Sequence, residues 1–398
     1  MTYDYDVIVV GGRVAGASTA MLLARQGHRV LIVERAAMPS DTISTHAILR
    51  TGVLQLRKWG VLDRIVDAGT PPIRDITLGF GEERIAFQVR PDHGIDTLFA
   101  PRRFVLDAIL VDAAREAGAE LVDRTVMSDL LRDGSGRIHG IRVGRGASAR
   151  SITSRYVVGA DGYRSRVADL AGSTVRRSHP ATNAINYGYY EGVDVSGFWF
   201  QFTPGVNAGL IPTNDDQVLV FTGRPAHLRR RFAEDPDSEF MRLIEQGGPD
   251  LAGRVRSGKR VGRFHGTNGL PGFIRQAWGP GWALVGDAGF TKDPISAHGI
   301  SDALRDAELC ARAVDRSLRS PEQAIESMRT YETLRDSLSL RMFEESRQLA
   351  RFEWAPEEAS RRMRVISEEV RRECDVLVSL PGWDDAGALV GAAAHRAG

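Results

Sequence analysis

Hydrophobic positions near the start of the chain follow two different spacings. Residues 6–10 (DVIVV) form a short β-branched run, which is typical of a strand buried on both faces of a parallel sheet. Residues 16–27 (GASTAMLLARQG) are rich in alanine and leucine and end in glycine, which predicts a helix. Residues 28–35 (HRVLIVER) predict a second buried strand that ends in Glu34. The order strand, helix, strand predicts a βαβ unit at the N-terminus.

Two later regions show the alternation expected of half-buried strands. Residues 70–100 and 175–275 contain aromatic-rich stretches such as NAINYGYYEGV and GFWFQFTPG. Four of their side chains are candidates to line a pocket for a planar or polycyclic molecule: Tyr187, Tyr189, Trp199 and Phe200. Because successive side chains of a strand point to opposite faces, we expect half of such residues to face away from any pocket. The segment from Ser320 to about Leu380 carries charges of mixed sign and predicts a covering helix pair.

Composition and charge narrow the class of protein. The 398 residues carry 52 basic and 51 acidic side chains, so the net charge of +1 offers no electrostatic case for nucleic acid or an anionic membrane. The two cysteines, Cys310 and Cys374, lie far apart, and we expect neither disulfides nor a metal site. The start MTYDYD is unlike a signal peptide, and no apolar run approaches the roughly 18 residues that span a bilayer. We therefore expect a soluble, cytoplasmic protein without a membrane or nucleic-acid partner; the oligomeric state is unknown.

The turn between the first strand and the helix departs from the dinucleotide-binding pattern G-x-G-x-x-G. Its sequence is GGRVAG, so Gly11 and Gly16 are kept, but Arg13 stands where a glycine normally admits the pyrophosphate. Glu34 follows Gly11 by 23 residues, close to the roughly 20 expected for an acid that binds a ribose 2′-hydroxyl. We therefore expect a nucleotide at the start of this helix, with an unphosphorylated ribose as in FAD or NAD.

Two roles for Arg13 are open from the sequence. Its guanidinium group can itself be a bidentate phosphate ligand, which would replace part of the lost backbone contact. Alternatively, the side chain points into solvent and the nucleotide lies slightly higher above the turn. Neither role abolishes the site, because the N-terminus of the helix still faces the diphosphate.

Two more motifs follow. Asp161-Gly162 comes after a predicted strand, and Gly286-Asp287 ends another strand (WALVGD) ahead of Pro294, Gly299 and a helix. Taken singly, each aspartate has an alternative role in hydrogen-bonding its own turn. Taken with GGRVAG, in this order and at this spacing, the motifs resemble those of the FAD-dependent monooxygenase superfamily. This superfamily includes aromatic hydroxylases, flavin-dependent halogenases and geranylgeranyl reductases.

The resemblance implies an α/β fold. A Rossmann-like FAD-binding domain, with a parallel sheet and the N-terminal βαβ unit, is interleaved with a mostly antiparallel β-sheet substrate domain and followed by C-terminal helices. The FAD-binding domain is expected in the pieces 1–70, 98–175 and 275–320. The substrate domain is expected in 71–97 and 176–274, and the C-terminal helical segment in 321–398.

The resemblance also implies which residues hold FAD. Glu34 would bind the adenosine ribose, and Arg103, in the family's R-x-x-L helix start, would contact the diphosphate side. Asp161 belongs to a pair that serves FAD and the nicotinamide donor, Asp287 binds the ribityl or pyrophosphate portion, and the loop Pro294–Ser301 lies beside the flavin ring. The complete expected set is Gly11, Gly12, Arg13, Ala15, Gly16, Glu34, Arg35, Arg103, Val126, Asp161, Gly286, Asp287, Pro294, Gly299 and Ile300.

The loop beside the expected flavin departs from the family pattern. Ala297 stands where a glycine is usual, His298 follows it, and Ser301 replaces the usual asparagine. The helix that begins near Gly299 has a partial positive charge at its N-terminus, which stabilises the anion formed on flavin reduction. His298 is a candidate catalytic residue that carries protons or tunes the flavin; the alternative is a polar loop residue.

His46 is the second candidate catalytic residue. It ends the stretch DTISTH, which leads into an apolar helix pattern. In one interpretation the polar residues before the helix are capping residues, Thr45 above all. In the other, Ser44, Thr45 and His46 lie on the substrate face of the flavin and bind substrate or transfer protons.

The choice of reaction rests on what the chain lacks. Halogenases of this superfamily carry W-x-W-x-I-P and an essential lysine, whereas residues 207–212 here read NAGLIP and no lysine lies between Lys58 and Lys259. Halogenation is therefore disfavoured, and hydroxylation of an aromatic or polyketide-like molecule leads. In that mechanism NADH or NADPH reduces FAD, O₂ forms a flavin C4a-hydroperoxide, and one oxygen is transferred to the substrate.

Two points about the reaction stay open. The nicotinamide donor either binds transiently or is replaced by a separate flavin reductase, since no second glycine fingerprint follows a strand. The alternatives to hydroxylation are a reductase or dehydrogenase of the geranylgeranyl reductase type, and a flavin-binding protein without turnover.

Overall fold

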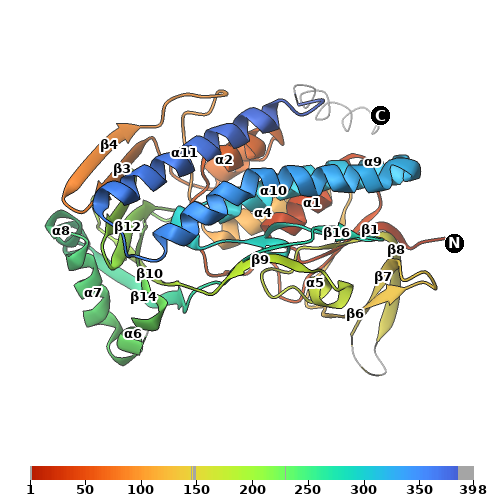
Figure 1. The fold of residues 1–398 in the computed structure, drawn as a ribbon, viewed down its shortest axis with the longest axis horizontal. Coiled ribbons are helices and arrows are strands. Elements are labelled where there is room, and N and C mark those ends of the chain that lie inside the picture. Colours follow the sequence, from red (N-terminus) through yellow and green to blue (C-terminus); the bar gives the residue numbers. More distant parts are fainter. Residues whose placement is uncertain (1, 145, 147–148, 229, 384–398) are drawn as a thin grey trace.

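The structure, a computed structural model, describes residues 2–144, 146, 149–228 and 230–383 (Figure 1). Its N-terminal βαβ unit consists of β1 (Tyr5–Val10), α1 (Val14–Arg25) and β2 (Val30–Val33). β1 and β2 are parallel neighbours, with Val7 opposite Val30. The predicted strand–helix–strand order is thus confirmed, although the helix begins two residues earlier than the sequence pattern suggested.

β1 lies inside an eight-stranded sheet. It pairs in parallel with β2 on one side and with β8 (Arg150–Gly159) on the other. β5 (Glu120–Val122) continues the parallel order beyond β2, and β17 (Trp282–Leu284) continues it beyond β8. Three antiparallel strands complete the sheet: β6 (Met127–Arg132), β7 (Ile138–Val143) and β16 (Trp278–Gly279). The carboxyl ends of the parallel strands meet at one edge, where open α/β sheets bind ligands.

A seven-stranded sheet forms the second half of the molecule, in the order β14-β10-β13-β12-β11-β3-β4. β3 and β11 are parallel, and all other neighbours are antiparallel. Its strands are β3 (Asp75–Phe80), β4 (Glu83–Gln88), β10 (Asn183–Glu191), β11 (Phe198–Thr203), β12 (Val206–Pro212), β13 (Val218–Pro225) and β14 (Lys259–Thr267). This mostly antiparallel sheet beside a parallel one is the expected mixed α/β architecture.

A small third sheet lies where the chain passes between the two large ones. β9 (Val175–His179) leads into β10, and β15 (Gly272–Arg275) follows β14. These two strands pair antiparallel with each other, and β18 (Phe290–Thr291) pairs with β15. The outgoing and returning segments of the chain therefore lie side by side.

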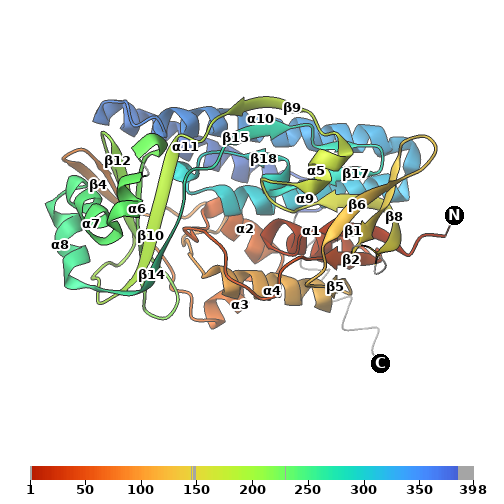
Figure 2. The same cartoon turned by 90° about the horizontal axis from the view of Figure 1, so that it is seen from below.

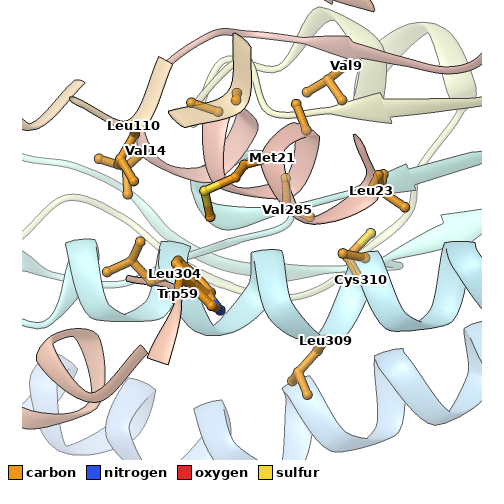
Figure 3. Close-up of a cluster of buried hydrophobic side chains, with 14 of the residues drawn as sticks. Val9, Val14, Met21, Leu23, Trp59, Leu110, Val285, Leu304, Leu309 and Cys310 are labelled. Atoms are coloured by element: carbon orange, nitrogen blue, oxygen red, sulfur yellow. The ribbon is translucent and has the colours of Figure 1, made fainter. Parts of the chain in front are cut away.

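The largest hydrophobic core lies between the parallel sheet and α9 (Gly299–Arg319). Figure 3 shows Met21 of α1 and Val285 close to Leu304 and Cys310 of α9, all buried. α10 (Ala324–Leu349) packs on α9, and α11 (Pro356–Val378) packs on α10 and on α2 (Arg50–Lys58). α10 and α11 run lengthwise across the molecule (Figures 1 and 2), and they are the helix pair that the sequence predicts after Ser320. The rest of the expected C-terminal segment, 384–398, lies outside the described residues.

Further helices and 3₁₀ turns complete the fold. α7 (Pro236–Gln246) and α8 (Pro249–Ser257) cover the outer face of the seven-stranded sheet. The others are α3 (Leu62–Asp67), α4 (Arg103–Glu116), α5 (Arg166–Ala171), α6 (Arg230–Glu234) and the 3₁₀ turns η2 (Ala226–Leu228), η3 (Gly286–Ala288), η4 (Pro294–Ser296) and η5 (Pro321–Gln323). Within the described part of the chain, no helix is both long and apolar enough to cross a membrane.

Candidate functional site

Two glycines of the GGRVAG turn are required by close backbone packing. Gly11 has φ 108°, and a Cβ atom on it would lie 2.3 Å from the carbonyl oxygen of Ala160. A Cβ atom on Gly16 would lie 1.8 Å from the carbonyl oxygen of Gly11. No side chain fits at either distance, so the turn depends on both residues. These are the two glycines of the fingerprint that the sequence retains.

Arg13, the unexpected residue of the turn, is held by protein groups. Its Nη1 atom lies 3.0 Å from Oδ2 of Asp107 and 3.2 Å from the carbonyl oxygen of Ser40. Its Nη2 atom donates to the Ser40 hydroxyl at 3.0 Å. The side chain is only 27% exposed, so the alternative in which it points into solvent is not what the structure has. Arg13 instead ties the turn to α4 and to the segment after β2.

Asp107 joins Arg13 to Arg103. Its carboxylate is fully buried and accepts hydrogen bonds from Arg103 Nε at 3.1 Å and Nη2 at 3.0 Å, in addition to the bond from Arg13. Burial raises the pKa of Asp107, and the two arginines oppose that shift. Since both oxygens accept from guanidinium groups, we treat the group as a carboxylate. Two arginines and one carboxylate leave one net positive charge where α1 and α4 begin.

Asp107 was missed in the sequence analysis. The signal was present, because Asp107 follows Arg103 by four residues on a predicted helix, the spacing of an i,i+4 ion pair. Its contact with Arg13, however, joins residues 94 positions apart, which a local pattern does not reveal.

Glu34 closes the carboxyl end of β2. Its Oε2 atom accepts the backbone N–H of Gly12 at 2.7 Å, and its Oε1 atom accepts that of Ala36 at 2.8 Å. The exposed residues Arg35 and Val126 lie close by, since Thr125 donates its N–H to the carbonyl oxygen of Glu34 at 2.9 Å. The structure therefore gathers the residues expected around the adenosine at the ends of β1 and β2.

Asp161 hydrogen-bonds its own turn. Its carboxylate accepts from the hydroxyl of Ser165 at 2.5 Å and from the N–H groups of Arg166 and Val167 at 2.7 and 3.1 Å. Burial raises the pKa of Asp161, and these hydrogen bonds oppose the shift. The local role that the sequence analysis kept as an alternative is thus present, because Asp161 supports the start of α5.

Asp287 lies close to the GGRVAG turn. It follows Gly286 (φ 55°), and a Cβ atom added to Gly286 would lie 3.0 Å from the Cβ atom of Ala15. The Asp287 side chain reaches solvent, yet protein surrounds it so closely that desolvation raises the pKa of its carboxyl. The positive charges of Lys292 and Arg103 act in the opposite direction.

The loop from Pro294 to Gly299 ends at an uncapped helix. Ala297 adopts the left-handed conformation (φ 53°, ψ 27°), which suits the glycine that the family resemblance implies at this position. No side chain caps α9, Gly299 is exposed, and a Cβ atom added to it would meet no atom within 4 Å. Ile300 is buried, and Ser301, which replaces the usual asparagine, accepts the N–H of Leu49 at 3.2 Å. The first N–H groups of α9 are thus open to an electronegative partner.

His298 is the N-cap residue of α9, but its side chain is buried against α11. Its side chain is 1% exposed and its Nε2 atom lies 2.8 Å from Oε2 of Glu373 on α11. Burial lowers the pKa of His298, and Glu373 opposes the shift. The histidine is thus a buried link between the loop and α11, and its role in carrying protons or tuning the flavin stays a prediction.

Whereas the His298 side chain contacts α11, the His46 side chain lies against the seven-stranded sheet. It has a left-handed backbone (φ 67°), is 1% exposed, and its Nε2 atom lies 2.7 Å from the hydroxyl of Tyr189. Burial, with Arg103 and Arg102, holds the pKa of His46 well below 6.5, so the ring is neutral at pH 7. Its Nδ1 atom has no hydrogen-bond partner among the described residues. The capping role expected for Thr45 is wrong, because α2 begins at Arg50 with Leu49 as its N-cap.

The inner face of the seven-stranded sheet is aromatic. Tyr187, Tyr189 and Phe221 belong to a buried cluster against which Phe200 of β11 packs. Ala297 also packs there; it belongs to the loop Pro294–Gly299, which we call the cofactor loop. Trp199 is the exception among the four pocket candidates, since it lies on the outer face with the residues that contact α7 and α8. Strand alternation thus sends the four aromatic side chains to both faces of the sheet: Trp199 to the outer face and the other three to the inner face, toward the loop.

Gly209 lies on that inner face, at a position where the halogenase pattern has an aromatic residue. Gly209 occupies the second tryptophan position of the halogenase pattern W-x-W-x-I-P. A Cβ atom added to it would lie 2.5 Å from Cε1 of Phe221 and 2.1 Å from the carbonyl oxygen of Trp199. A tryptophan does not fit there without moving Phe221, while the argument against halogenation itself stays a prediction.

Comparisons with known proteins agree with this arrangement. The family described as FAD binding domain matches residues 4–346. The chain is 25% identical over 350 residues to the digeranylgeranylglycerophospholipid reductase of Methanothrix thermoacetophila, with 82% of each chain covered. It is 26% identical over 322 residues to the 6-methylpretetramide 4-monooxygenase of Streptomyces rimosus, covering 76% of this chain and 73% of that one.

A solved structure shows the same fold. PqsL, described as a probable FAD-dependent monooxygenase from Pseudomonas aeruginosa, superposes with a TM-score of 0.78 at 21% sequence identity. The superposition covers 92% of this chain and 99% of that one. Since the family match spans most of the chain and includes the three motifs, the protein belongs to the FAD binding domain family and is an FAD-dependent oxidoreductase.

Proposed function

We propose that the protein is a monooxygenase that hydroxylates an aromatic or polyketide-like small molecule with electrons from NADH or NADPH. The observation that carries the proposal is the neutral, buried His46–Tyr189 pair on the aromatic sheet face that packs against the cofactor loop. FAD, when bound, supplies electron transfer and O₂ activation. The protein then has to bind the substrate, exclude water and move protons.

The residues at the carboxyl edge of the parallel sheet fit FAD. The net positive charge of the Arg13–Asp107–Arg103 group suits a diphosphate, and the open N-termini of α1 and α9 add partial positive charge. Glu34 is buried at the end of β2, the position of an acid that binds a ribose. Asp287 offers a carboxylate in the turn after β17. These groups would hold the adenosine, diphosphate and ribityl portions.

His46 is the proposed proton-transfer residue. Burial raises the pKa of Tyr189, so its hydroxyl keeps its proton, and it can donate to Nε2 of the neutral imidazole 2.7 Å away. In the tautomer with the imidazole proton on Nδ1, that buried atom has no described partner, and a substrate oxygen would bind it only after the side chains that cover it move. Arg102, whose guanidinium lies 3.7 Å from the centre of the Tyr189 ring, fixes that ring from its other side.

A labelling experiment tests the proposal. The FAD-loaded enzyme is incubated with NADH or NADPH under ¹⁸O₂ and a panel of phenols and hydroxylated anthraquinones. Substrate-dependent NAD(P)H oxidation with one ¹⁸O atom in the product is the expected result. Oxidation that yields only hydrogen peroxide with every member of the panel would count against this substrate class.

A second candidate function is reduction of a carbon–carbon double bond. It is favoured by the similarity to a digeranylgeranylglycerophospholipid reductase, whose name states a polyprenyl lipid substrate. Anaerobic turnover with a polyprenyl lipid, and a product two hydrogens heavier, would identify this activity. Bound FAD that takes up electrons but never turns over would leave the third alternative, a flavin-binding protein without catalysis.

A further inference from the structure

A group of buried charged side chains joins the cofactor loop to the C-terminal helix. Lys292 precedes the loop, Asp302 and Arg305 lie in the first two turns of α9, and Glu373 comes from α11. Each is at most 7% exposed. Lys292 contacts Asp302, while Nη1 of Arg305 lies 3.0 Å from Oδ1 of Asp302 and 3.2 Å from Oε1 of Glu373. We call these four residues, together with His298 and Asp306, the loop-base cluster.

Glu373 is the member of the loop-base cluster that holds His298. Its Oε2 atom lies 2.8 Å from Nε2 of His298 and accepts the hydroxyl of Thr51 at 3.3 Å. Burial alone would raise the pKa of Glu373, but Arg305 and His298 outweigh it and lower the pKa to about 2. The carboxylate is therefore an acceptor, and the neutral imidazole donates its Nε2 proton to it.

The cluster is built for charge pairing and not for a metal ion. Ligand atoms of His298, Asp302 and Glu373 lie within 4.8 Å of one another, which by distance alone suits a cation. The amino group of Lys292 and the guanidinium of Arg305 already contact those carboxylates. A cation would have to displace both basic groups, so the positive charge of this site is supplied by the protein.

The carboxylates of the cluster outnumber its basic groups. Asp302, Asp306 and Glu373 face Lys292 and Arg305, and Arg305 donates to Asp306 at 2.8 Å. Burial and Arg305 lower the pKa of Lys292 to about 7, but its direct contact with the Asp302 carboxylate favours the charged amino group. With Lys292 charged and His298 neutral, one negative charge is in excess. The excess lies under the start of α9, because His298 directly precedes Gly299, the first residue of that helix. It therefore opposes the partial positive charge of the helix end.

We infer that Glu373 is a positioning residue of the cofactor loop: it holds His298 against α11 and supplies the excess negative charge beneath the start of α9. This charge disfavours the negative charge that FAD acquires on reduction, so it keeps the reduction potential of the bound cofactor low. The inference requires FAD in the site but not hydroxylation, so it goes beyond the proposed function.

The test compares Glu373→Gln with Glu369→Gln. Both variants remove a buried carboxylate from α11, but Glu369 pairs with Arg341 at 2.9 Å and Arg372 at 3.1 Å, outside the cluster. The midpoint potential of bound FAD is measured anaerobically against a reference dye at pH 7.5, without substrate. For Glu373→Gln we expect the balance of reduced to oxidised FAD to increase about tenfold, or about 30 mV for a two-electron couple. For Glu369→Gln we expect the wild-type potential.

Other outcomes overturn the inference. Equal potentials in all three proteins would mean that Glu373 is structural only, and equal shifts in both variants would mean a general disturbance of α11. Glu373→Gln leaves two carboxylates facing two basic groups, so the variant keeps a balanced cluster.

A second measurement covers the case in which Glu373→Gln does not fold. Nitrogen-15 spectra of histidine in the wild-type holoenzyme, assigned with His298→Gln, report the protonation of His298 directly. A neutral ring with its proton on Nε2 supports the inference. A doubly protonated ring at pH 7.5 overturns it, because the cluster would then carry no excess charge. Neither measurement needs a substrate, so failure here is separate from failure of the proposed hydroxylation.

Discussion

The guanidinium of Arg13 lies 3.0 Å from the carboxylate of Asp107, which is fully buried and also binds Arg103. A residue that breaks the glycine pattern of the nucleotide turn is thus compensated by an acid from a helix more than ninety residues later in the chain. The arrangement makes the turn, α4 and the segment around Ser40 one hydrogen-bonded unit. It also makes the stability of the turn depend on Asp107.

Asp107→Asn should destabilise the fold. The change removes the carboxylate that the two arginines share, and it leaves two like charges close together. Because both arginines are partly exposed, we expect the free energy of unfolding to fall by about 2 kcal/mol, less than the roughly 3–5 kcal/mol of a fully buried pair. Asp112→Asn is the matched control, since Asp112 pairs only at 3.8 Å with Arg115 on the exposed side of the same helix. Denaturant unfolding that shows equal stabilities for the two variants would contradict the prediction.

Arg13→Gly should weaken FAD binding although it restores the standard glycine. The variant loses the net positive charge of the Arg13–Asp107–Arg103 group and the anchor of the Ser40 segment. We expect the dissociation constant for FAD, from fluorescence titration, to increase about tenfold, or about 1.4 kcal/mol. Arg13→Lys keeps the charge but not the forked donor, and an intermediate value is expected. If Arg13→Gly binds FAD as tightly as the wild type or more tightly, Arg13 does not contribute to FAD binding.

His46 should make stability depend on pH. Its pKa in the folded protein lies well below the ordinary 6.5, so below pH 6.5 the unfolded chain binds a proton that the folded protein excludes. The stability linked to neutral His46 is complete above pH 6.5 and decreases on acidification by up to about 1.4 kcal/mol per pH unit. His46→Gln should show a shallower loss of unfolding free energy between pH 6.5 and 5. Parallel pH profiles for wild type and variant would rule out this linkage.

Ala297→Gly should not destabilise the protein, in contrast to the usual effect of glycine. Ala297 is left-handed, which costs an L-residue roughly 1 kcal/mol that glycine avoids. The greater freedom of glycine in the unfolded chain offsets part of this gain, so we expect a stability between unchanged and about 0.5 kcal/mol higher. Ala313→Gly, in the right-handed interior of α9, should lose about 1 kcal/mol. Thermal unfolding of both variants makes the comparison, and equal losses would refute it.

The sequence predicted those parts of the fold and site that depend on local patterns. The run DVIVV, the retained Gly11 and Gly16, and the position of Gly286-Asp287 after a strand were sufficient for the parallel sheet and for FAD. Contacts between distant segments could not be predicted. The direction of His298 depends on Glu373, 75 residues later, and the orientation of Trp199 depends on the strand register. A single-residue difference in register would have placed Trp199 on the inner face.

The pairing of β9 with β15 has a consequence for how such enzymes diversify. Gly272 lies opposite His179, so the long insertion that contains β10–β14 begins and ends at adjacent points of the chain. A segment whose ends are held together can be lengthened, shortened or exchanged without separating the strands to which it is attached. The segment that carries β10–β14 can therefore vary in length while the strands at its base stay paired, whereas β3 and β4 of the same seven-stranded sheet come from an earlier part of the chain.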